Sequence, residues 1–293
     1  MADPDPTAPA VAILHPGEMG AAVGACARDA GLRVVWASAG RGRATRERAG
    51  RAGLADAGTL GDALDAAGVA LSICPPHGAL DVAKAVATHG FRGTFVDANA
   101  VAPETTREIG RIVEAAGARF VDGGIVGPPP GPGVRTRLYL SAPGARAVAD
   151  LFAGTPVEAI VLDGPVGAAS GLKMCYAAWT KGSTALVAAI RAVAASEGVE
   201  AALVEEWRAS QPDLLARSEG VRASARKGWR WVAEMEEIAA TFAAAGLPDG
   251  FHRAAAEIYR RLEPYRDAGS PPALDDVVRA LRPPGRPTII KMQ

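Results

Sequence analysis

Hydrophobic and polar positions follow two different patterns along the chain. In the first half, short apolar runs recur between helix-like segments, and the runs are AVAIL (10–14), RVVWA (33–37), VALSIC (69–74), GTFVDA (93–98) and ARFVDG (118–123). The helix-like segments lie at 18–30, near 59–66, at 78–88 and at 103–116. Short apolar strands that alternate with helices are typical of parallel βαβ units, whose sheet is covered on both faces. Two further runs, at 135–142 and 157–164, flank a helix-like segment at 144–153 and extend the predicted sheet.

The second half reads as helical throughout. Residues 166–195 are rich in Ala, Leu and Val and contain no proline, which predicts one helix of roughly 30 residues, or about 45 Å. Helical patterns follow at 199–209, 227–245, 250–262 and 273–281.

These patterns predict the fold class and the domains. We expect an α/β Rossmann-type N-terminal domain at 10–164 and an all-α C-terminal domain at 165–283, joined by the long interdomain helix. The remaining segments, 1–9 and 284–293, contain several prolines and are expected to form a disordered N-terminal tail and a loose C-terminal tail.

Composition excludes several classes of protein. The 32 basic and 32 acidic residues cancel, so no global field favours nucleic acid or an anionic membrane. No run of about 18 apolar residues lacks a charge, so no membrane span is predicted. The three cysteines show no CxxC spacing, and we interpret them as buried thiols in a reducing compartment. With no signal-like start and no His/carboxylate cluster, we expect a cytoplasmic protein without a metal site.

The first apolar run leads into a turn with the features of a dinucleotide site. A strand, a tight turn and a helix N-terminus place free backbone N–H groups where a pyrophosphate binds. In HPGEMG, Gly17 and Gly20 match the second and third glycines of G-x-G-x-x-G, while a histidine stands at the first. An ordinary Pro-Gly turn remains the alternative interpretation. The predicted cofactor turn comprises His15, Pro16, Gly17, Glu18, Met19 and Gly20.

The end of the second strand indicates which cofactor binds. An acid usually stands there for NAD, but here Ser38 takes that position, with Arg41 and Arg43 close behind. A hydroxyl and a guanidinium suit a 2′-phosphate, which a carboxylate would repel. The sequence therefore predicts NADPH (NADP) as cofactor, with the alternative that both arginines only solvate a loop.

Five motifs in order resemble the β-hydroxyacid dehydrogenase superfamily, which includes 3-hydroxyisobutyrate and 6-phosphogluconate dehydrogenases and the imine reductases. They are GEMG (17–20), CPP (74–76), DANAVAP (97–103), DGGIVGPP (122–129) and GPVGAASGLKMCYAA (164–178). The segment 226–252 resembles the helical C-terminal domain of a less characterised branch.

The resemblance implies roles for further residues. Lys173 takes the place of the catalytic lysine, and it stands as an isolated cation in AASGLKMCYAAW; a snorkelling lysine is the alternative. Tyr176, one turn beyond, is a second candidate for proton transfer, with simple packing as its alternative. The resemblance adds Cys74, Pro75, Pro76 and Asn99 to the cofactor site, and Gly124, Ile125, Val126 and Lys173 to the substrate site. It also makes a homodimer plausible.

Departures from the pattern limit what is expected of the substrate. The usual K-x-x-N-N asparagines are Tyr176 and Ala177, and the usual loop serine is Val126. Loss of these donors argues against a small hydroxy carboxylate bound in the usual way. The leading hypothesis is an NADPH-dependent oxidoreductase that interconverts a hydroxyl and a carbonyl of a small molecule. An imine reductase and a non-catalytic NADPH-binding protein are the alternatives.

Overall fold

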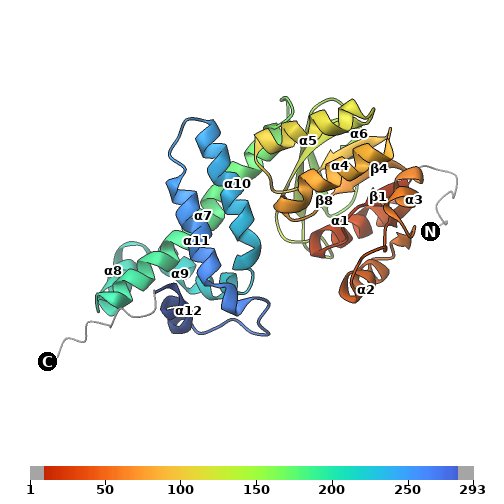
Figure 1. Ribbon diagram of the computed structural model, residues 1–293. Helices are drawn as coiled ribbons and strands as arrows, with labels where there is room; N and C mark the ends of the chain where they lie inside the picture. The colour runs from red at the N-terminus through yellow and green to blue at the C-terminus, as the bar shows by residue number, and fades with distance from the viewer. Residues whose placement is uncertain (1–9, 283–293) are drawn as a thin grey trace. The chain divides into compact units, whose positions relative to one another are not determined.

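The structure is a computed structural model that describes residues 10–282 (Figure 1). The tails predicted at 1–9 and 284–293 lie outside the described residues. The chain divides into two compact units between Met174 and Cys175. The division falls inside the long helix rather than after residue 164, because the first turns of that helix are bonded to the sheet of the N-terminal unit.

The N-terminal unit contains an eight-stranded sheet in the order β3-β2-β1-β4-β5-β6-β7-β8. Every neighbouring pair is parallel except β6 and β7, which are antiparallel. The chain order reverses between β1 and β4, and ligands of open α/β sheets bind at the carboxyl ends of the strands on either side of such a point. The strands are β1 (Ala10–Ile13), β2 (Val34–Trp36), β3 (Ala55–Asp56), β4 (Ala67–Ser72), β5 (Thr94–Asp97), β6 (Arg119–Val126), β7 (Thr136–Ser141) and β8 (Val157–Val161).

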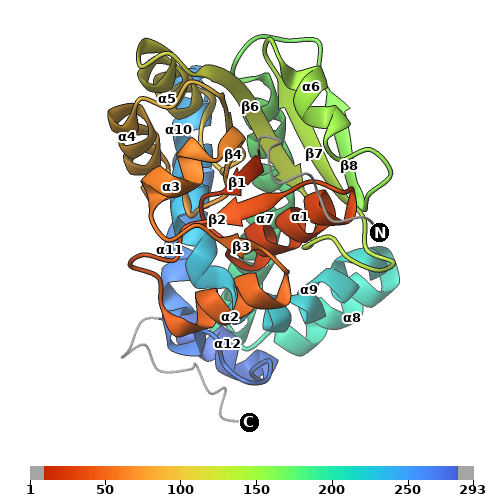
Figure 2. The same cartoon turned by 90° about the vertical axis from the view of Figure 1, so that its right-hand side faces the viewer.

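Helices cover both faces of this sheet (Figure 2). Val11 and Ile13 of β1 face one apolar cluster, which α1, α2 and α6 complete, while Ala10 and Ala12 face a second, which α3, α4 and α5 complete. Strands buried on both faces explain the continuous apolar runs of the sequence. The helices are α1 (Glu18–Asp29), α2 (Arg43–Arg51), α3 (Leu60–Asp65), α4 (Ala79–His89), α5 (Pro103–Ala115) and α6 (Ala145–Asp150), and a short 3₁₀ turn, η1 (Pro76–Gly78), precedes α4.

The C-terminal unit is helical, as predicted. The long helix α7 (Ala168–Ser196) has 29 residues and runs from the first unit into the second. The other helices are α8 (Glu200–Ser210), α9 (Pro212–Ala225), α10 (Trp231–Ala244), α11 (Gly250–Arg261) and α12 (Leu274–Leu281), with 3₁₀ turns η2 (Gly228–Arg230) and η3 (Glu263–Tyr265). The ring of Trp231 meets that of Tyr259 edge-on at 5.1 Å between centroids, inside this unit.

Two helices escaped the sequence analysis. Ala49 is the only buried residue of α2, and α9 buries only Ser218, Val221 and Ala225. Helix detection from sequence depends on an apolar stripe, and neither segment has a sustained one. The predicted fold class, Rossmann-type α/β followed by all-α, is confirmed.

Candidate functional site

The turn after β1 has the geometry of a dinucleotide cradle. Gly17 is the N-cap of α1 and offers no side-chain cap to the helix. A Cβ added at Gly17 would have no atom within 4 Å, whereas one added at Gly20 would overlap the carbonyl oxygen of His15. Gly20 is therefore required for α1 to approach the turn, while the space beside Gly17 stays open. These features fit the pyrophosphate of a nicotinamide cofactor.

The side chains of the predicted cofactor turn have different surroundings. Pro16 is buried, Met19 packs against the core, and Glu18 is exposed. His15 lines a 310 Å³ cavity at the carboxyl ends of β1 and β2, and its Nδ1 is buried without a hydrogen-bond partner among the described residues. Burial and the nearby Arg41 guanidinium lower the pKa of His15 to about 4, so this ring is neutral at pH 7. The cavity is lined by Leu14, His15, Ala37, Ala39, Arg41, Leu60, Asp81, Val82 and Ala85.

Guanidinium groups hold this turn from the side of β2. Arg41 donates to the carbonyl oxygen of Leu14 at 3.2 Å, and Arg48 of α2 donates to that of Pro16, also at 3.2 Å. Arg43 instead pairs with Glu47 at 2.6 Å, and its side chain is 92% exposed. The structure thus brings Arg41 to the cavity and leaves Arg43 on the surface. The sequence analysis missed Arg48, because its position on an unrecognised helix concealed its direction.

Ser38 has an acidic neighbour that the sequence analysis also missed. Its side chain hydrogen-bonds the carboxylate of Asp56 at the end of β3, and this bond, with one from the Gly58 amide, lowers the pKa of Asp56. The Nε of Arg46 donates to the carbonyl oxygen of Arg41 at 3.1 Å. Cationic and anionic side chains therefore both lie at the end of β2. The sequence pattern did not reveal this contact, because β3, which pairs with β2, is only two residues long.

The ends of β4 and β5 are joined by Asn99. Its Oδ1 accepts a hydrogen bond from the Cys74 amide at 2.5 Å, and its Nδ2 donates to Ser72 Oγ at 3.0 Å and to Asp97 Oδ1. Asn99 is only 2% exposed, so the structure shows it shaping the loop at 74–76, and direct contact with a cofactor stays a prediction.

The loop at 74–76 leads from β4 toward α4. Pro75 is exposed, and Pro76 begins η1. Burial raises the pKa of the Cys74 thiol to about 11, which keeps it a thiol rather than a thiolate at neutral pH. The role of this loop toward a cofactor stays a prediction.

The two glycines of β6 allow close contact on two sides. A Cβ added at Gly123 would lie 3.0 Å from the Asp97 carbonyl oxygen, and one at Gly124 would lie 2.6 Å from that of Ala169 and 3.1 Å from Lys173 Cβ. Lys173 therefore lies directly against Gly124. Ile125 belongs to the apolar cluster under the sheet and Val126 is 2% exposed, so both pack inward, and their contact with substrate stays a prediction.

Tyr176 lies three residues beyond Lys173 on α7 and belongs to the second unit. Its side chain is 45% exposed. No described contact gives it a structural partner, and a part in proton transfer stays a prediction.

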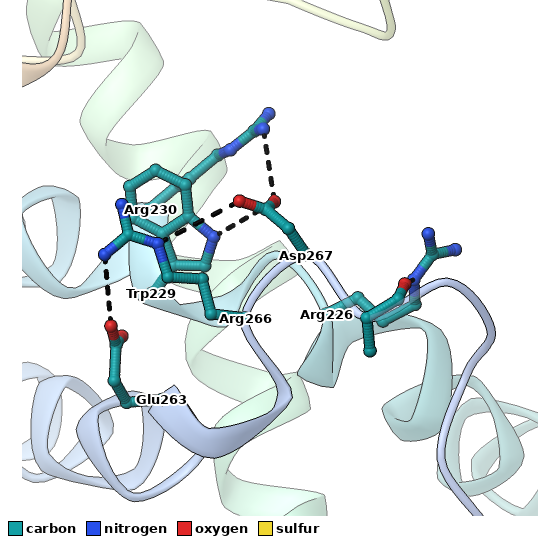
Figure 3. Close-up of polar contacts among 7 residues, drawn as sticks. Arg226, Trp229, Arg230, Glu263, Arg266 and Asp267 are labelled. Atoms are coloured by element: carbon teal, nitrogen blue, oxygen red, sulfur yellow. Dashed lines mark hydrogen bonds and ion pairs between the residues drawn. The ribbon is translucent and has the colours of Figure 1, made fainter.

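Most tryptophans of the helical unit have structural contacts. Trp207 is buried, and Trp229 lies under the guanidinium of Arg266, 3.9 Å from the ring centroid. Figure 3 shows how Asp267 completes this group, accepting a hydrogen bond from Trp229 Nε1 at 3.4 Å and lying 3.6 Å from Arg230. The group fastens the segment after η3 to η2. Trp179 is 64% exposed, and the guanidinium of Arg217 lies over its ring, 5.4 Å from the centroid.

The cysteines correct one expectation. Cys26 is buried as predicted, Cys74 is half-buried, and Cys175 is exposed. Among residues 10–282, no group of three or more His, Cys, Asp or Glu side chains is placed to hold a metal ion. Within the same residues, none of the helices combines the length and apolar character that crossing a membrane requires.

Comparison with known proteins gives limited sequence matches. Residues 194–262 match the family model "Domain of unknown function (DUF1932)". An uncharacterised 28.5 kDa protein of Methanothermus fervidus is 29% identical over 170 residues, which is 57% of this chain and 63% of that protein. The match thus spans less than two thirds of that relative.

Solved structures match over nearly the whole chain. A conserved protein of unknown function, described as structurally similar to 3-hydroxyacid dehydrogenases, is 25% identical with a TM-score of 0.63, over 87% of this chain and 97% of that one. Mycobacterium tuberculosis 3-hydroxyisobutyrate dehydrogenase with L-serine is 17% identical with a TM-score of 0.69, over 94% and 99%. An Aspergillus terreus reductive aminase in complex with NADPH is 18% identical with a TM-score of 0.54, over 94% and 100%.

A Streptomyces aurantiacus imine reductase shares the fold as well, at 21% identity and a TM-score of 0.54, over 94% of this chain and 100% of that one. The fold of the chain is therefore similar to that of the 3-hydroxyacid dehydrogenases, and residues 194–262 of its helical part match DUF1932.

Proposed function

We propose that the protein is an NADPH-dependent oxidoreductase that interconverts a hydroxyl and a carbonyl group of a small molecule. The observation that carries this proposal is the turn at 14–20, where Gly17 borders open space and Gly20 lets α1 close on the strand. The fold of the 3-hydroxyacid dehydrogenases supports the reaction class.

In the proposed mechanism Lys173 is the general acid/base. A bound NADPH would supply the hydride. Lys173 Nζ donates a proton to the carbonyl oxygen as that oxygen gains negative charge, and accepts it back in the reverse direction. Because Gly124 has no side chain, the backbone of α7 approaches β6 closely, and Lys173 lies against this glycine. Tyr176 is the second candidate for the proton path.

The preference for NADPH is proposed from the charges around the end of β2. Arg41 points into the cavity beside His15, and Arg46 and Arg48 lie close by. Asp56 opposes them, because a carboxylate beside Ser38 suits ribose hydroxyls better than a phosphate. The guanidinium groups outnumber it, and the reductive aminase relative binds NADPH.

Titration with NADPH and with NADH, followed by nicotinamide fluorescence, tests the cofactor. We expect NADPH to bind at least about tenfold tighter, or 1.4 kcal/mol. Arg41→Ala should remove most of that difference, while the matched Arg43→Ala should not, because Arg43 pairs with Glu47 on the surface. Tighter binding of NADH would identify Asp56 as the discriminating residue, and Asp56→Asn should then restore NADPH. Binding of neither cofactor would refute the proposed function.

An imine reductase is the second candidate. The loss of carboxylate-binding donors at Val126 and Ala177 favours it, and the similarity in fold to an imine reductase supports it. NADPH oxidation should be followed with a panel of aldehydes and ketones and with cyclic imines. Turnover of imines alone would replace the leading proposal, and Lys173→Ala should abolish turnover of carbonyl compounds.

We also propose a homodimer formed through α7. Three exposed apolar side chains recur every seven residues on this helix: Trp179, Leu186 and Val193 are 64%, 56% and 61% exposed. Trp179 and Leu186 also line a 270 Å³ groove between α7 and α11, and the rest of its α7 side consists of small residues such as Gly182 and Ala185. A seven-residue apolar repeat suits packing against a second helix. A second copy of the chain would supply such a helix, with the same apolar repeat and the same groove.

Sedimentation of the purified protein tests the dimer. Leu186→Glu should shift the protein to a monomer, because it places a charge in the apolar seam. Leu247→Glu is the control, since Leu247 is equally apolar and 55% exposed but lies outside this seam. A monomeric wild type, or a dimer unaffected by Leu186→Glu, would contradict the proposal.

A further inference from the structure

Asp122 is a buried acid that the proposed mechanism does not use. It lies in the middle of β6 and is 0% exposed. Its Oδ2 accepts hydrogen bonds from the backbone amides of Gly167, Ala169 and Ser170 at 2.9, 3.0 and 3.2 Å. It also accepts one from Ser141 Oγ of β7 at 2.9 Å. A buried carboxylate with four donors on one oxygen is tightly fixed.

Three of these donors, the backbone amides, belong to the start of α7. The helix begins at Ala168, and the amides of a helix's first turn have no partner within the helix. A residue just before the helix usually caps them, but here the cap comes from a strand more than 40 positions earlier in the chain. A carboxylate at this end also complements the helix dipole. Asp122 therefore bonds the first turn of α7 to the sheet.

A second contact prevents this turn from rotating. Ser170 Oγ donates to Asp122 Oδ1 at 2.6 Å and lies 2.7 Å from Thr106 Oγ1 of α5. Lys173 follows one turn later on the same face as Ala169 and Ser170. Its Cβ lies where Gly124 has no side chain. The bonds of Asp122 thus fix the turn of α7 that immediately precedes Lys173.

We propose that Asp122 is a positioning residue for Lys173, holding the lysine at the edge of the sheet where it acts as general acid/base. This inference rests on the proposed function, because it concerns the same lysine. In the DGG segment (122–124), Asp122 then orients α7, while Gly123 and Gly124 leave room for the neighbouring backbone.

The test measures the accessibility of Lys173 itself. Acetic anhydride labels amines, and mass spectrometry gives the labelling rate of Lys173 relative to exposed Lys84 of α4 in the same unit. Asp122→Ala frees the first turn of α7, so we expect this ratio to rise at least threefold at pH 8. Asp122→Asn keeps the shape and one acceptor oxygen and should give a smaller rise. It also provides a folded variant should Asp122→Ala fail to fold.

Asp62→Asn is the matched control. Asp62 is an acid of the same unit that lies in the capping box of α3, where its carboxylate bonds Thr59 instead of the start of α7. It should lower the melting temperature without changing the Lys173 labelling ratio. In both Asp122 variants the Kd for NADPH should stay within twofold of wild type, while kcat on any substrate identified falls at least tenfold.

An unchanged labelling ratio in folded Asp122→Asn and Asp122→Ala would overturn the inference, as would equal changes in Asp62→Asn. The proposed function fails differently: NADPH does not bind to the wild type, or Lys173→Ala leaves turnover intact. The labelling needs neither cofactor nor substrate, so the two failures are separable.

Discussion

Two turns at the carboxyl edge of the same sheet are held by side chains of opposite charge. At 14–16, Arg41 and Arg48 each donate one hydrogen bond to a backbone carbonyl oxygen. At 167–170, Asp122 accepts bonds from backbone amides. A guanidinium has five N–H donors, so each arginine keeps donors to spare, and Arg41 Nε has no hydrogen-bond partner within residues 10–282. Both oxygens of Asp122 are already engaged.

The difference separates a turn suited to binding from a turn suited to support. An anionic ligand in the open space beside Gly17 can accept hydrogen bonds from these spare donors. A carboxylate with all its bonds made inside the protein has nothing left to offer a ligand, so it can only fix backbone. The carboxyl edge of the sheet therefore has one turn that can bind a ligand and one turn whose carboxylate is already fully bonded.

The largest effect is expected from glycine substitutions in the first turn. Gly20→Ala places a Cβ on the His15 carbonyl oxygen, so it should lower the free energy of unfolding by about 3 kcal/mol. Gly17→Ala meets no atom and should cost less than about 1 kcal/mol, yet it should abolish binding of NADPH by filling the phosphate space. Denaturant unfolding and calorimetric titration measure the two. Equal losses of stability would remove the distinction between them.

The next effect concerns acid stability. The pKa of His15 is lowered to about 4 in the folded protein, while an unfolded chain takes the proton near about 6.5. Between these two values only the unfolded state gains a proton, so stability is lost as the pH falls from about 6.5 to 4, by about 3 kcal/mol. His15→Gln should flatten this part of the stability curve, whereas His77→Gln, at an exposed position, should not. An unchanged slope in His15→Gln would show that other groups govern it.

A smaller effect is expected from Arg48. Arg48→Ala removes spare donors beside the turn, so affinity for NADPH and for ADP should fall together by about tenfold, or 1.4 kcal/mol. Arg51→Ala, at an exposed position on the same helix, is the control. A loss confined to ligands with a 2′-phosphate would place Arg48 with Arg41 in cofactor choice instead.

The smallest effect is expected at the second turn. Ser141→Ala removes one of the donors to Asp122 Oδ2 and leaves the amide donors in place. The free energy of unfolding should fall by about 1 kcal/mol, with no change in affinity for NADPH. A loss above about 3 kcal/mol would mean that the amides alone do not satisfy the carboxylate.

Local sequence pattern predicted much of the fold. The apolar runs and the proline-free stretch after Pro165 indicated the sheet and the long helix because burial on both faces and helix length leave a local signature. The turn at Gly17 and Gly20 was recognisable for a similar reason, since glycine spacing there reflects backbone geometry. Where the pattern was weak, as in α2 and α9, the helices were missed.

Direction and partnership of side chains were decided by tertiary structure. Arg41 and Arg43 are alike in sequence, yet one turns to the cavity and the other to solvent. Asn99 turns inward, and Asp56 and Asp122 meet partners contributed by other elements. The sequence by itself determined which backbone elements form, because their periodicity is local. Only the folded chain decided which polar groups meet, because strand order and helix packing bring together residues that no local pattern connects.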